Sequence, residues 1–393
     1  MLAGTKEGVT DDLDTQELTV TRALPVVSEL PADSTPDDHA AAVGLVYVSD
    51  DEPGLTRLPW GQGFTYRDVD GETLPQDHPD RQRAEELVIP PAWTDVWICT
   101  DPKGHIQATG RDDAGRKQYL YHPKWRGIRD ATKFHRMGAF AAALPTIRDT
   151  VDSHLRKRTF TREKMLALVV ALLDETLIRI GSDQYARTTG GRGLTTLEGE
   201  HVEVAGSRVR FAFPAKSGQE RELELRHRRL ARQLLKCEEI PGQRLFSYED
   251  EGGWHQVDSG AVNDYLREVA GDRLTAKDFR TWGGTVVAAE TLRELGPPEG
   301  ASDAGAKVLM AIDAVAERLG NTRAVARNSY VDPRVPKAYR FGRFDEVWDD
   351  DPDTIDRLSP AERAVERILD LDMPPSSDLE AQLEASLAAV EDD

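Results

Sequence analysis

The spacing of hydrophobic residues changes once along this chain, and the change limits the architecture to a strand-rich region followed by a helical one. From about Gly44 to Tyr121, short β-type runs such as LVYVSD, GFTYRDVDGETL and KQYLYH are separated by the turns VDGE and DPKG. From about Ala131, apolar residues recur at helical spacing, as in REKMLALVVALLDETLIRIG over 162–181. Strands followed by helices predict an α+β chain with more than one domain.

The negative charge of the chain is concentrated at its two ends. The net charge is −20, but residues 341–393 hold 17 Asp/Glu against 4 Arg, and residues 1–40 hold 9 acidic against 2 basic residues. Residues 41–340 hold 44 basic and 44 acidic residues and are neutral. A neutral region can still carry a basic groove on one face, so the overall charge does not exclude a nucleic-acid partner.

Charge and periodicity together predict four regions. Residues 1–40 read as an acidic disordered tail, and 41–126 as a small, mostly antiparallel β-domain. Residues 127–340 read as a mainly helical domain, and 341–393 as an acidic tail. This tail contains one short helical segment over 359–371, with a Ser N-cap and Pro at its first position.

The helical region also contains a stretch of alternating residues. LTTLEGEHVEVAGSRVRFAFPAKSGQERELEL (194–225) predicts a three-stranded meander, with turns at LEGE or VAGS and at AKSGQ. Amphipathic helices are expected at RHRRLARQLLKCEE and SGAVNDYLREVAG. A further helix should be entered through Gly283 and Gly284, and another should end at Gly320.

Several function classes receive no support from the sequence. Only two cysteines occur, which fits a reducing compartment and leaves no cysteine-rich zinc site. The nine histidines are scattered without metal-ligand spacing, and no phosphate-binding loop of the GxxxxGK[ST] type is present. We see no secretion signal and no apolar run of the roughly 18 residues that a membrane helix needs. We therefore expect no metal, no nucleotide, no cofactor and no membrane partner.

Three cationic residues are candidates for phosphate chemistry. Arg179 is expected near the end of an apolar helix, Lys216 at a hairpin tip, and Arg280 just before the double-glycine helix entry. Each also has an ordinary interpretation, because an arginine at a helix end can bond the last carbonyls and a turn lysine is commonly only solvated. Taken singly, the three positions leave both interpretations open.

Tyr330 lies in an unusual setting for a tyrosine. It stands in NTRAVARNSYVDP, a basic and amide-rich segment that begins with Asn321. An isolated tyrosine there would be a half-buried surface residue near a helix end. If cations converge on it, the same residue becomes a nucleophile aimed at a phosphate.

Taken in order, these residues resemble the catalytic set of the type IB topoisomerases of bacteria and poxviruses. The resemblance covers about Leu58 to Asp332. Its motifs are RLPWGQGFTYRDVDGETL, LVIPPAWTDVWIC, GHIQATGRDDAGRKQYLYHPKW, LIRIGSDQY, GLTTLEGEHVEV, KDFRTWGGT and ARNSYVDP. It implies a tyrosine recombinase-like catalytic fold. The implied activity is relaxation of supercoiled DNA by transient single-strand cleavage, strand rotation and religation, without ATP or metal.

The resemblance also implies a role for each catalytic candidate. Tyr330 would attack a DNA phosphodiester, giving a 3′-phosphotyrosyl intermediate and a free 5′-hydroxyl. Arg179 and Arg280 would clamp the non-bridging oxygens, and Lys216 would protonate the leaving 5′-oxygen. Asn321 stands where many relatives have histidine. It keeps a hydrogen-bond donor for a phosphate oxygen but cannot transfer a proton, so one titration near neutral pH should be lost.

In this family the two domains clamp double-stranded DNA. Gln107 in GHIQATG matches a glutamine that can approach base edges. The expected phosphate contacts are Arg116, Lys117, Tyr185 and Lys277. The ordinary alternative for each is an exposed polar residue.

Two other functions remain to be weighed. A tyrosine recombinase or integrase would usually carry His three residues before the second arginine, where this chain has Lys277. A DNA-binding relative without catalysis would have no need of the intact Tyr330, Arg179, Lys216 and Arg280; Asn321 alone speaks for it. We expect a monomeric bacterial enzyme, cytoplasmic and associated with the nucleoid.

Overall fold

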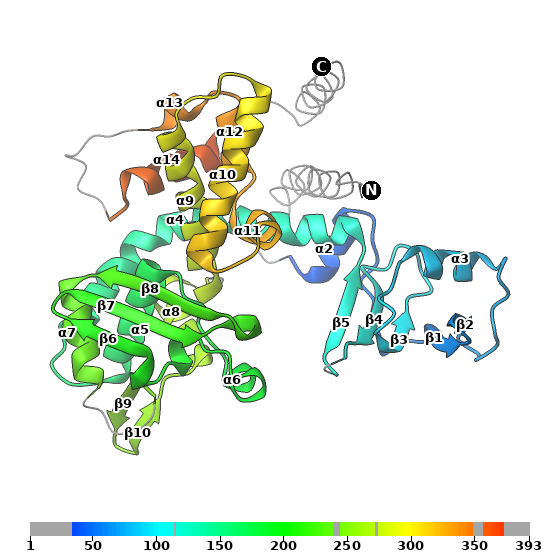
Figure 1. Ribbon diagram of the computed structural model, residues 1–393, viewed down its shortest axis with the longest axis horizontal. Coiled ribbons are helices and arrows are strands. Elements are labelled where there is room, and N and C mark those ends of the chain that lie inside the picture. Colours follow the sequence, from blue (N-terminus) through cyan, green and yellow to red (C-terminus); the bar gives the residue numbers. More distant parts are fainter. Residues whose placement is uncertain (1–33, 114, 239–243, 272–273, 349–356, 373–393) are drawn as a thin grey trace, which may run out of the picture. The chain divides into compact units, whose positions relative to one another are not determined.

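The structure, a computed structural model, describes residues 34–113, 115–238, 244–271, 274–348 and 357–372 (Figure 1). The chain divides into two compact units, residues 1–135 and 136–393. Most of the predicted N-terminal tail, residues 1–33, lies outside the described residues. Among the described helices, none has both the length and the apolarity needed to cross a membrane.

The first unit is built on the predicted antiparallel sheet. Its strands are β1 (Leu55–Trp60), β2 (Gly63–Arg67), β3 (Thr94–Ile98), β4 (Ile106–Arg111) and β5 (Lys117–Tyr121), in the order β2-β1-β3-β4-β5. Two helices accompany it, α2 (Pro36–Ala42) and α3 (Pro79–Glu86). The core consists of the buried residues Leu55, Tyr66, Leu74, Ala84, Ile89, Val96, Ile98 and Ala108. The expected N-terminal β-domain is confirmed.

A buried arginine organises the loop before β3. The Arg57 guanidinium donates hydrogen bonds to the carbonyls of Ile89 (2.8 Å), Pro90 (2.9 Å) and Trp93 (2.9 Å). It also lies over the Phe64 ring at 4.1 Å. Three carbonyl acceptors satisfy a charge that would otherwise be costly to bury, so the IPPAW motif is a structural loop held by the first strand.

The unit boundary falls inside a long helix, α4 (Pro123–Leu155), after His135. The predicted boundary at 126 is too early because the first turns of α4 are buried: Trp125, Ile128 and Phe134 are almost fully covered. The Trp125 ring packs edge-on against His105 of the first unit, with centroids 4.7 Å apart. The basic stretch that the sequence suggests as a linker is therefore partly core.

The second unit is mainly helical, as predicted. After α4 its helices are α5 (Arg162–Thr176), α6 (Asp183–Thr189), α7 (Arg228–Cys237), α8 (Ser259–Ala270), α9 (Ala276–Leu295), α10 (Ala301–Leu319), α11 (Arg323–Tyr330), α12 (Arg334–Arg340), α13 (Phe344–Val347) and α14 (Pro360–Asp370). A small hairpin that the sequence did not predict joins β9 (Ser247–Asp250) and β10 (Gly253–Gln256). The apolar helix α5 is the centre of this unit, with ten of its residues buried.

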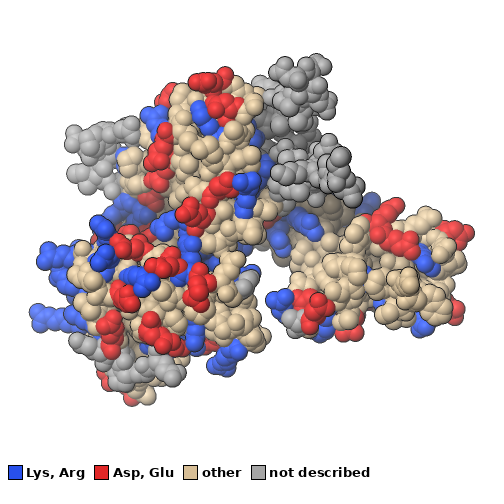
Figure 2. Space-filling model, in the orientation of Figure 1, with Lys and Arg blue, Asp and Glu red and all other residues tan. Residues whose placement is uncertain are grey.

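The predicted meander is present as β6 (Val202–Ala205), β7 (Arg208–Pro214) and β8 (Glu220–Arg226), antiparallel and in sequence order. Val209 and Phe211 of β7 are buried, while Arg210 between them pairs with Glu222 at 2.7 Å and Glu203 at 3.1 Å. Figure 2 shows basic and acidic side chains interspersed over this sheet. The alternation therefore directs apolar residues inward and leaves a charge-balanced outer face.

Two helix boundaries differ from the prediction. Helix α5 ends at Thr176, because Leu177 takes a left-handed conformation with φ of 55°, so Arg179 lies beyond the helix. Helix α9 begins at Ala276, where Thr275 and Asp278 form a capping box, so Gly283 lies inside the helix and does not open it. Arg280 is consequently a helical residue.

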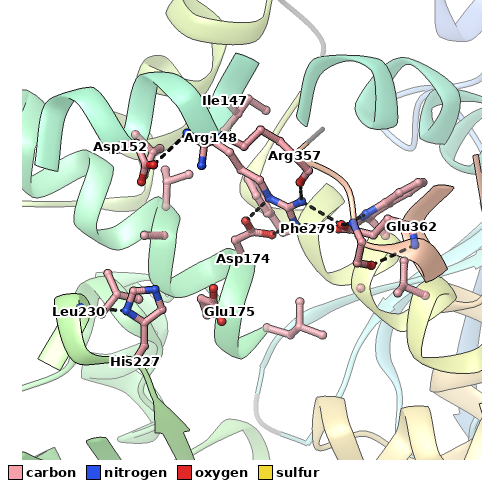
Figure 3. Close-up of a pocket in the computed structure, with 18 of the residues that line it drawn as sticks. Ile147, Arg148, Asp152, Asp174, Glu175, His227, Leu230, Phe279, Arg357 and Glu362 are labelled. Atoms are coloured by element: carbon pink, nitrogen blue, oxygen red, sulfur yellow. Dashed lines mark hydrogen bonds and ion pairs between the residues drawn. The ribbon is translucent and has the colours of Figure 1, made fainter. Parts of the chain in front are cut away.

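The C-terminal helix α14 is confirmed, with Ser359 as N-cap and Pro360 at its first position, but it is not part of a tail. The Arg148 side chain, from α4, bonds both Asp174 and Glu362 at 2.7 Å, and Trp282 donates to Glu362 at 3.1 Å (Figure 3). These groups line a cavity of about 610 Å³. The predicted boundary at 340 is therefore too early, because charged residues of α14 are buried against partners distant in sequence.

Candidate active site

Tyr330 is the last residue of α11, and its backbone is held against α9. The Thr285 hydroxyl accepts a hydrogen bond from the Asp332 amide at 3.1 Å, and its one proton is shared between the carbonyls of Thr281 at 2.8 Å and Tyr330 at 3.3 Å. A Cβ atom on Gly284 would lie 2.6 Å from the Tyr330 carbonyl oxygen. The second glycine of the TWGGT motif is therefore needed for close approach of the tyrosine segment, which explains a glycine in mid-helix.

Arg280 lies beside the Tyr330 ring. Its side chain is almost fully buried, and its Cζ atom is 5.0 Å from the ring centroid. The guanidinium donates to the carbonyls of Leu177 and, at 3.1 Å, of Leu319. These carbonyls lie at the C-terminal ends of α5 and α10. The positive charge of Arg280 is therefore held at the negative ends of two helix dipoles.

The unusual backbone of Leu177 is part of this support. Its left-handed conformation, which leucine rarely adopts, brings its carbonyl to Arg280. Its side chain packs so closely on α9 that a Cβ atom on Gly283 would lie 2.5 Å from Leu177 Cδ2. The first glycine of TWGGT thus makes room for the leucine that anchors Arg280.

Arg179 follows Leu177 and contacts the end of α10. Its guanidinium donates to the Asn321 side-chain oxygen and to the Gly320 carbonyl, the latter at 3.4 Å. We call Arg179, Arg280 and the carbonyls of Leu177, Leu319 and Gly320 the arginine cradle. Four of the five predicted catalytic residues, Tyr330, Arg179, Arg280 and Asn321, therefore lie together.

Two buried donors in this cluster lack a hydrogen-bond acceptor within the described parts of the chain. They are the side-chain nitrogen Nδ2 of Asn321 and Nε of Arg280. Buried polar groups are nearly always satisfied, so two donors without an acceptor beside two guanidinium groups fit a site at which a bound anion supplies the acceptor. A phosphate oxygen carries the negative charge that such donors bind most strongly.

The cradle also changes the acidity of its tyrosine. Burial alone would raise the pKa of Tyr330, but the charge and hydrogen bonding of Arg280, then the charges of Arg179 and Lys277, outweigh burial and lower this pKa. Burial lowers the pKa of Arg280 to about 10, so the guanidinium stays charged at neutral pH. A phenol with a lowered pKa is ionised more often at neutral pH, which favours attack, and its phenolate is a better leaving group.

Lys216 is not in contact with this cluster. It is exposed in the turn between β7 and β8, where Gly218 has a φ of 71°, as the predicted hairpin requires. Within the described residues, no hydrogen bond or ion pair joins Lys216 to the other four. We call β7, the turn and β8 (Arg208–Arg226) the lysine hairpin.

The structure gives Gln107 a different task from the predicted one. The side chain is buried in β4, and its amide donates to the carbonyls of Gly104 at 2.7 Å and Pro102 at 3.1 Å. Its oxygen lies 3.4 Å from Arg83. With both donors used by the DPKG turn, Gln107 acts here as a turn-stabilising residue, and its contact with a base stays a prediction.

The other predicted DNA contacts are at the surface. Arg116 pairs with Asp112 at 2.7 Å, and Lys117 pairs with Asp50 at 2.5 Å. Lys277 is exposed on the first turn of α9, close enough to Tyr330 to lower its pKa. Tyr185 lies in α6, 2.8 Å from where a Cβ atom on Gly191 would be. Their contacts with phosphate stay predictions.

One group of side chains in the described residues has the composition of a metal site: Glu198, Glu200 and His201. The Nδ1 atom of His201 accepts a hydrogen bond from the Glu198 amide at 3.0 Å, so in the neutral ring Nε2 carries the proton. Glu198 is also paired with Arg192 at 2.8 Å. This arrangement suits a loop-stabilising network better than a metal ligand set.

Two arginines near the cradle were missed from the sequence. Arg221 of β8 donates to the carbonyls of Glu317 at 2.9 Å and of Arg318. Arg318 in turn donates to the carbonyls of Glu175 at 2.8 Å and Thr176 at 3.4 Å. No sequence motif marks them, because their acceptors are backbone groups far away along the chain.

Comparison with known proteins identifies the family of this chain. The family described as eukaryotic DNA topoisomerase I, catalytic core, matches residues 122–338, and the bacterial DNA topoisomerase IB N-terminal domain matches residues 63–112. DNA topoisomerase 1B of Acanthamoeba polyphaga mimivirus is 29% identical over 288 residues, covering 71% of this chain and 85% of the relative.

More distant relatives come from poxviruses. DNA topoisomerase 1B of vaccinia virus (strain Copenhagen) and DNA topoisomerase I of monkeypox virus are each 21% identical over 212 residues, covering 53% of this chain and 65% of the relative. The matched catalytic core spans the whole arginine cradle, the lysine hairpin and Tyr330. The chain belongs to the type IB DNA topoisomerase family.

Proposed function

We propose that Tyr330 is the nucleophile with which this topoisomerase cleaves one DNA strand. The Tyr330 oxygen attacks the scissile phosphorus, a phosphorus–oxygen bond to tyrosine forms, and the bond to the 5′-oxygen breaks. The phenolic proton is lost to water before the attack, which the lowered pKa of Tyr330 favours. The product is a 3′-phosphotyrosyl enzyme and a 5′-hydroxyl end, and the retained ester bond makes ATP unnecessary.

The arginine cradle would stabilise the charge that develops on the phosphate. Arg179 and Arg280 present guanidinium groups that are already fixed by backbone carbonyls. Donors that need no reorganisation stabilise a transition state most effectively. The orphaned Asn321 amide would supply a further hydrogen bond to a non-bridging oxygen.

Lys216 would donate the proton that the leaving 5′-oxygen requires. Its ammonium group is exposed on a turn and close in sequence to the cradle-facing residue Ala215, which is buried. After strand rotation the 5′-hydroxyl returns this proton as it attacks the phosphotyrosine, and Tyr330 leaves as phenolate. The two half-reactions use the same groups in opposite directions.

The juxtaposition of Arg280 and Tyr330, 5.0 Å between Cζ and ring centroid, carries this proposal. Relaxation of supercoiled plasmid in EDTA without ATP tests it, comparing wild type with Tyr330→Phe. Wild type should relax the plasmid and the variant should not, while both bind DNA. Equal relaxation by the two proteins would exclude Tyr330 as the nucleophile.

The cellular setting is a separate part of the proposal. The N-terminal match to a bacterial domain supports a bacterial enzyme, and the two buried free cysteines fit a reducing cytoplasm. We propose that it acts on the nucleoid as a monomer, without metal or nucleotide. Light scattering of the purified protein, with and without a short duplex, would reveal any dimer.

A further inference from the structure

The position of the lysine hairpin has to be set by residues other than Lys216. Lys216 itself is exposed and makes no described contact with the arginine cradle. At the base of the turn, the Pro214 carbonyl, at the end of β7, accepts a hydrogen bond from the Arg192 amide at 2.7 Å. The other strand, β8, is held by its pairing with β7, and a side-chain anchor from β8 to a neighbouring helix would fix further where the turn points.

Arg221 supplies this attachment. It lies opposite Phe213 in the hairpin, five residues after Lys216, and its guanidinium spans the last turn of α10. It donates to the carbonyls of Glu317 and Arg318. Gly320 lies against the Arg221 guanidinium. Its φ is 59°, and a Cβ atom at this position would lie 3.2 Å from Arg221 Nη1, so glycine leaves room for the contact.

Arg221 binds the same C-terminal end of α10 that supplies carbonyls to the arginine cradle. The next carbonyls along the chain, of Leu319 and Gly320, accept from Arg280 and Arg179, and the following residue is Asn321. Arg221 and Phe213 also line the same small pocket as Arg179 and Arg280. One guanidinium fork therefore connects the hairpin that carries the proposed acid to the segment that holds the proposed phosphate-binding groups.

Placing Arg221 so close to two other arginines is electrostatically unfavourable. Burial lowers the pKa of Arg221, and the charges of Arg318 and Arg179 lower it further. A neutral side chain at position 221 would avoid this repulsion. If the lysine hairpin lay far from the arginine cradle, it would not need the two hydrogen bonds of the Arg221 guanidinium. The carbonyls at the C-terminus of α10 offset the repulsion through hydrogen bonds and the helix dipole.

We propose that Arg221 is a positioning residue for cleavage, holding the lysine hairpin on the end of α10 so that Lys216 meets the phosphate bound by the arginine cradle. The inference rests on the proposed role of Lys216 as proton donor. Because Arg221 would act through Lys216, its loss should slow cleavage where the leaving oxygen needs a proton, and religation in the reverse direction.

The test uses this distinction between proton donation and other effects. A duplex with a mapped cleavage site is prepared with either the natural 5′-oxygen or a bridging 5′-sulfur at the scissile phosphate. A thiolate leaves without protonation, so sulfur removes the need for a general acid. Single-turnover cleavage by saturating enzyme is measured for wild type, Arg221→Gln, Arg221→Lys, Lys216→Ala and Arg210→Gln.

Arg221→Gln should cleave the natural substrate on the order of a hundredfold more slowly, because a small misplacement of a catalytic group has that effect. It should recover to near the wild-type rate with sulfur, as Lys216→Ala should. Arg221→Lys keeps the charge but not the two-pronged guanidinium. Its cleavage rate on the natural substrate should fall between those of wild type and Arg221→Gln. Arg210→Gln removes an arginine from the same hairpin that pairs only with Glu203 and Glu222 in the described structure, and should cleave normally.

Three results would overturn the inference. If Lys216→Ala recovers with sulfur but Arg221→Gln stays slow, Arg221 acts by another route or only stabilises the fold. If Arg221→Lys equals wild type on both substrates, the fork is not needed. If Lys216→Ala itself fails to recover, the proposed acid is wrong and the inference falls with it. Thermal unfolding of each variant sets an assay temperature at which all are folded.

Discussion

The arginine cradle and the lysine hairpin serve the same phosphate in our account, yet they are built in opposite ways. Arg280 is buried, and its guanidinium is fixed by the Leu177 and Leu319 carbonyls. Lys216 is exposed at a turn and is free of described contacts to the cradle. The contrast indicates that charge stabilisation is pre-organised, whereas the proton donor is brought in by positioning its hairpin.

The largest effect should come from breaking the cradle. Arg280→Ala should slow single-turnover cleavage on the order of a thousandfold, since a donor aimed at transition-state charge is lost. It should also lower the free energy of unfolding by about 2–4 kcal/mol, because packing is lost and two carbonyls lose their donor. Quenched-flow cleavage and denaturant unfolding would measure the two effects. A variant within tenfold of the wild-type rate would contradict a pre-organised cradle.

Lys216→Ala should separate rate from stability. Cleavage should fall on the order of a hundredfold through loss of the general acid. The free energy of unfolding should stay within about 0.5 kcal/mol of wild type, because the side chain is exposed. The same two assays apply. A stability loss as large as that of Arg280→Ala would remove the contrast between the two regions.

A smaller effect is expected where α9 meets Tyr330. In Gly284→Ala the added methyl would lie 2.6 Å from the Tyr330 carbonyl oxygen, so the tyrosine segment must shift. We expect destabilisation of about 1–3 kcal/mol from overpacking, with slower cleavage. Gly305→Ala, in α10, is the matched control: nothing lies within 4 Å of its added methyl, so it should stabilise by about 0.5–1 kcal/mol. Equal results for both variants would show that close approach is unimportant.

The smallest effect concerns pH. Asn321 does not titrate, so the wild-type cleavage rate should rise with pH through the lowered pKa of Tyr330, without a second titration near pH 6.5 from this position. Asn321→His should keep the donor and add a second titration near or below pH 6.5, with rates a few-fold higher where the imidazole is charged. Rate–pH profiles of the two proteins would show it. A titration near pH 6.5 in the wild type instead would require another group that ionises there.

The sequence predicted much of the fold because local signals and tertiary packing agree there. The meander follows from alternation, and α14 from its Ser359 cap and Pro360. Convergence of Tyr330, Arg179, Arg280 and Asn321 was predicted from the order of the motifs. Lys216 was expected in the same cluster. In the structure it is exposed on the turn of the lysine hairpin, without a described contact to the other four residues.

The features that were missed depend on contacts between residues far apart in sequence. The left-handed Leu177 ends α5 where apolar periodicity continues, and the two glycines in α9 are explained only by the segments packed on them. Glu362 reads as a residue of an acidic tail until its pairing with Arg148 is known. A truncation that tests the acidic ends should therefore retain residues 34–372.

The central claim, that Tyr330 beside the arginine cradle is the nucleophile, is tested most directly by locating the covalent bond. Enzyme and duplex DNA would be mixed, stopped with detergent, digested with nuclease and protease, and examined by mass spectrometry. We predict a nucleotide joined through its 3′-phosphate to the peptide that contains Tyr330, absent from Tyr330→Phe. An adduct on another tyrosine, such as Tyr185, or one that persists in Tyr330→Phe, would contradict the account.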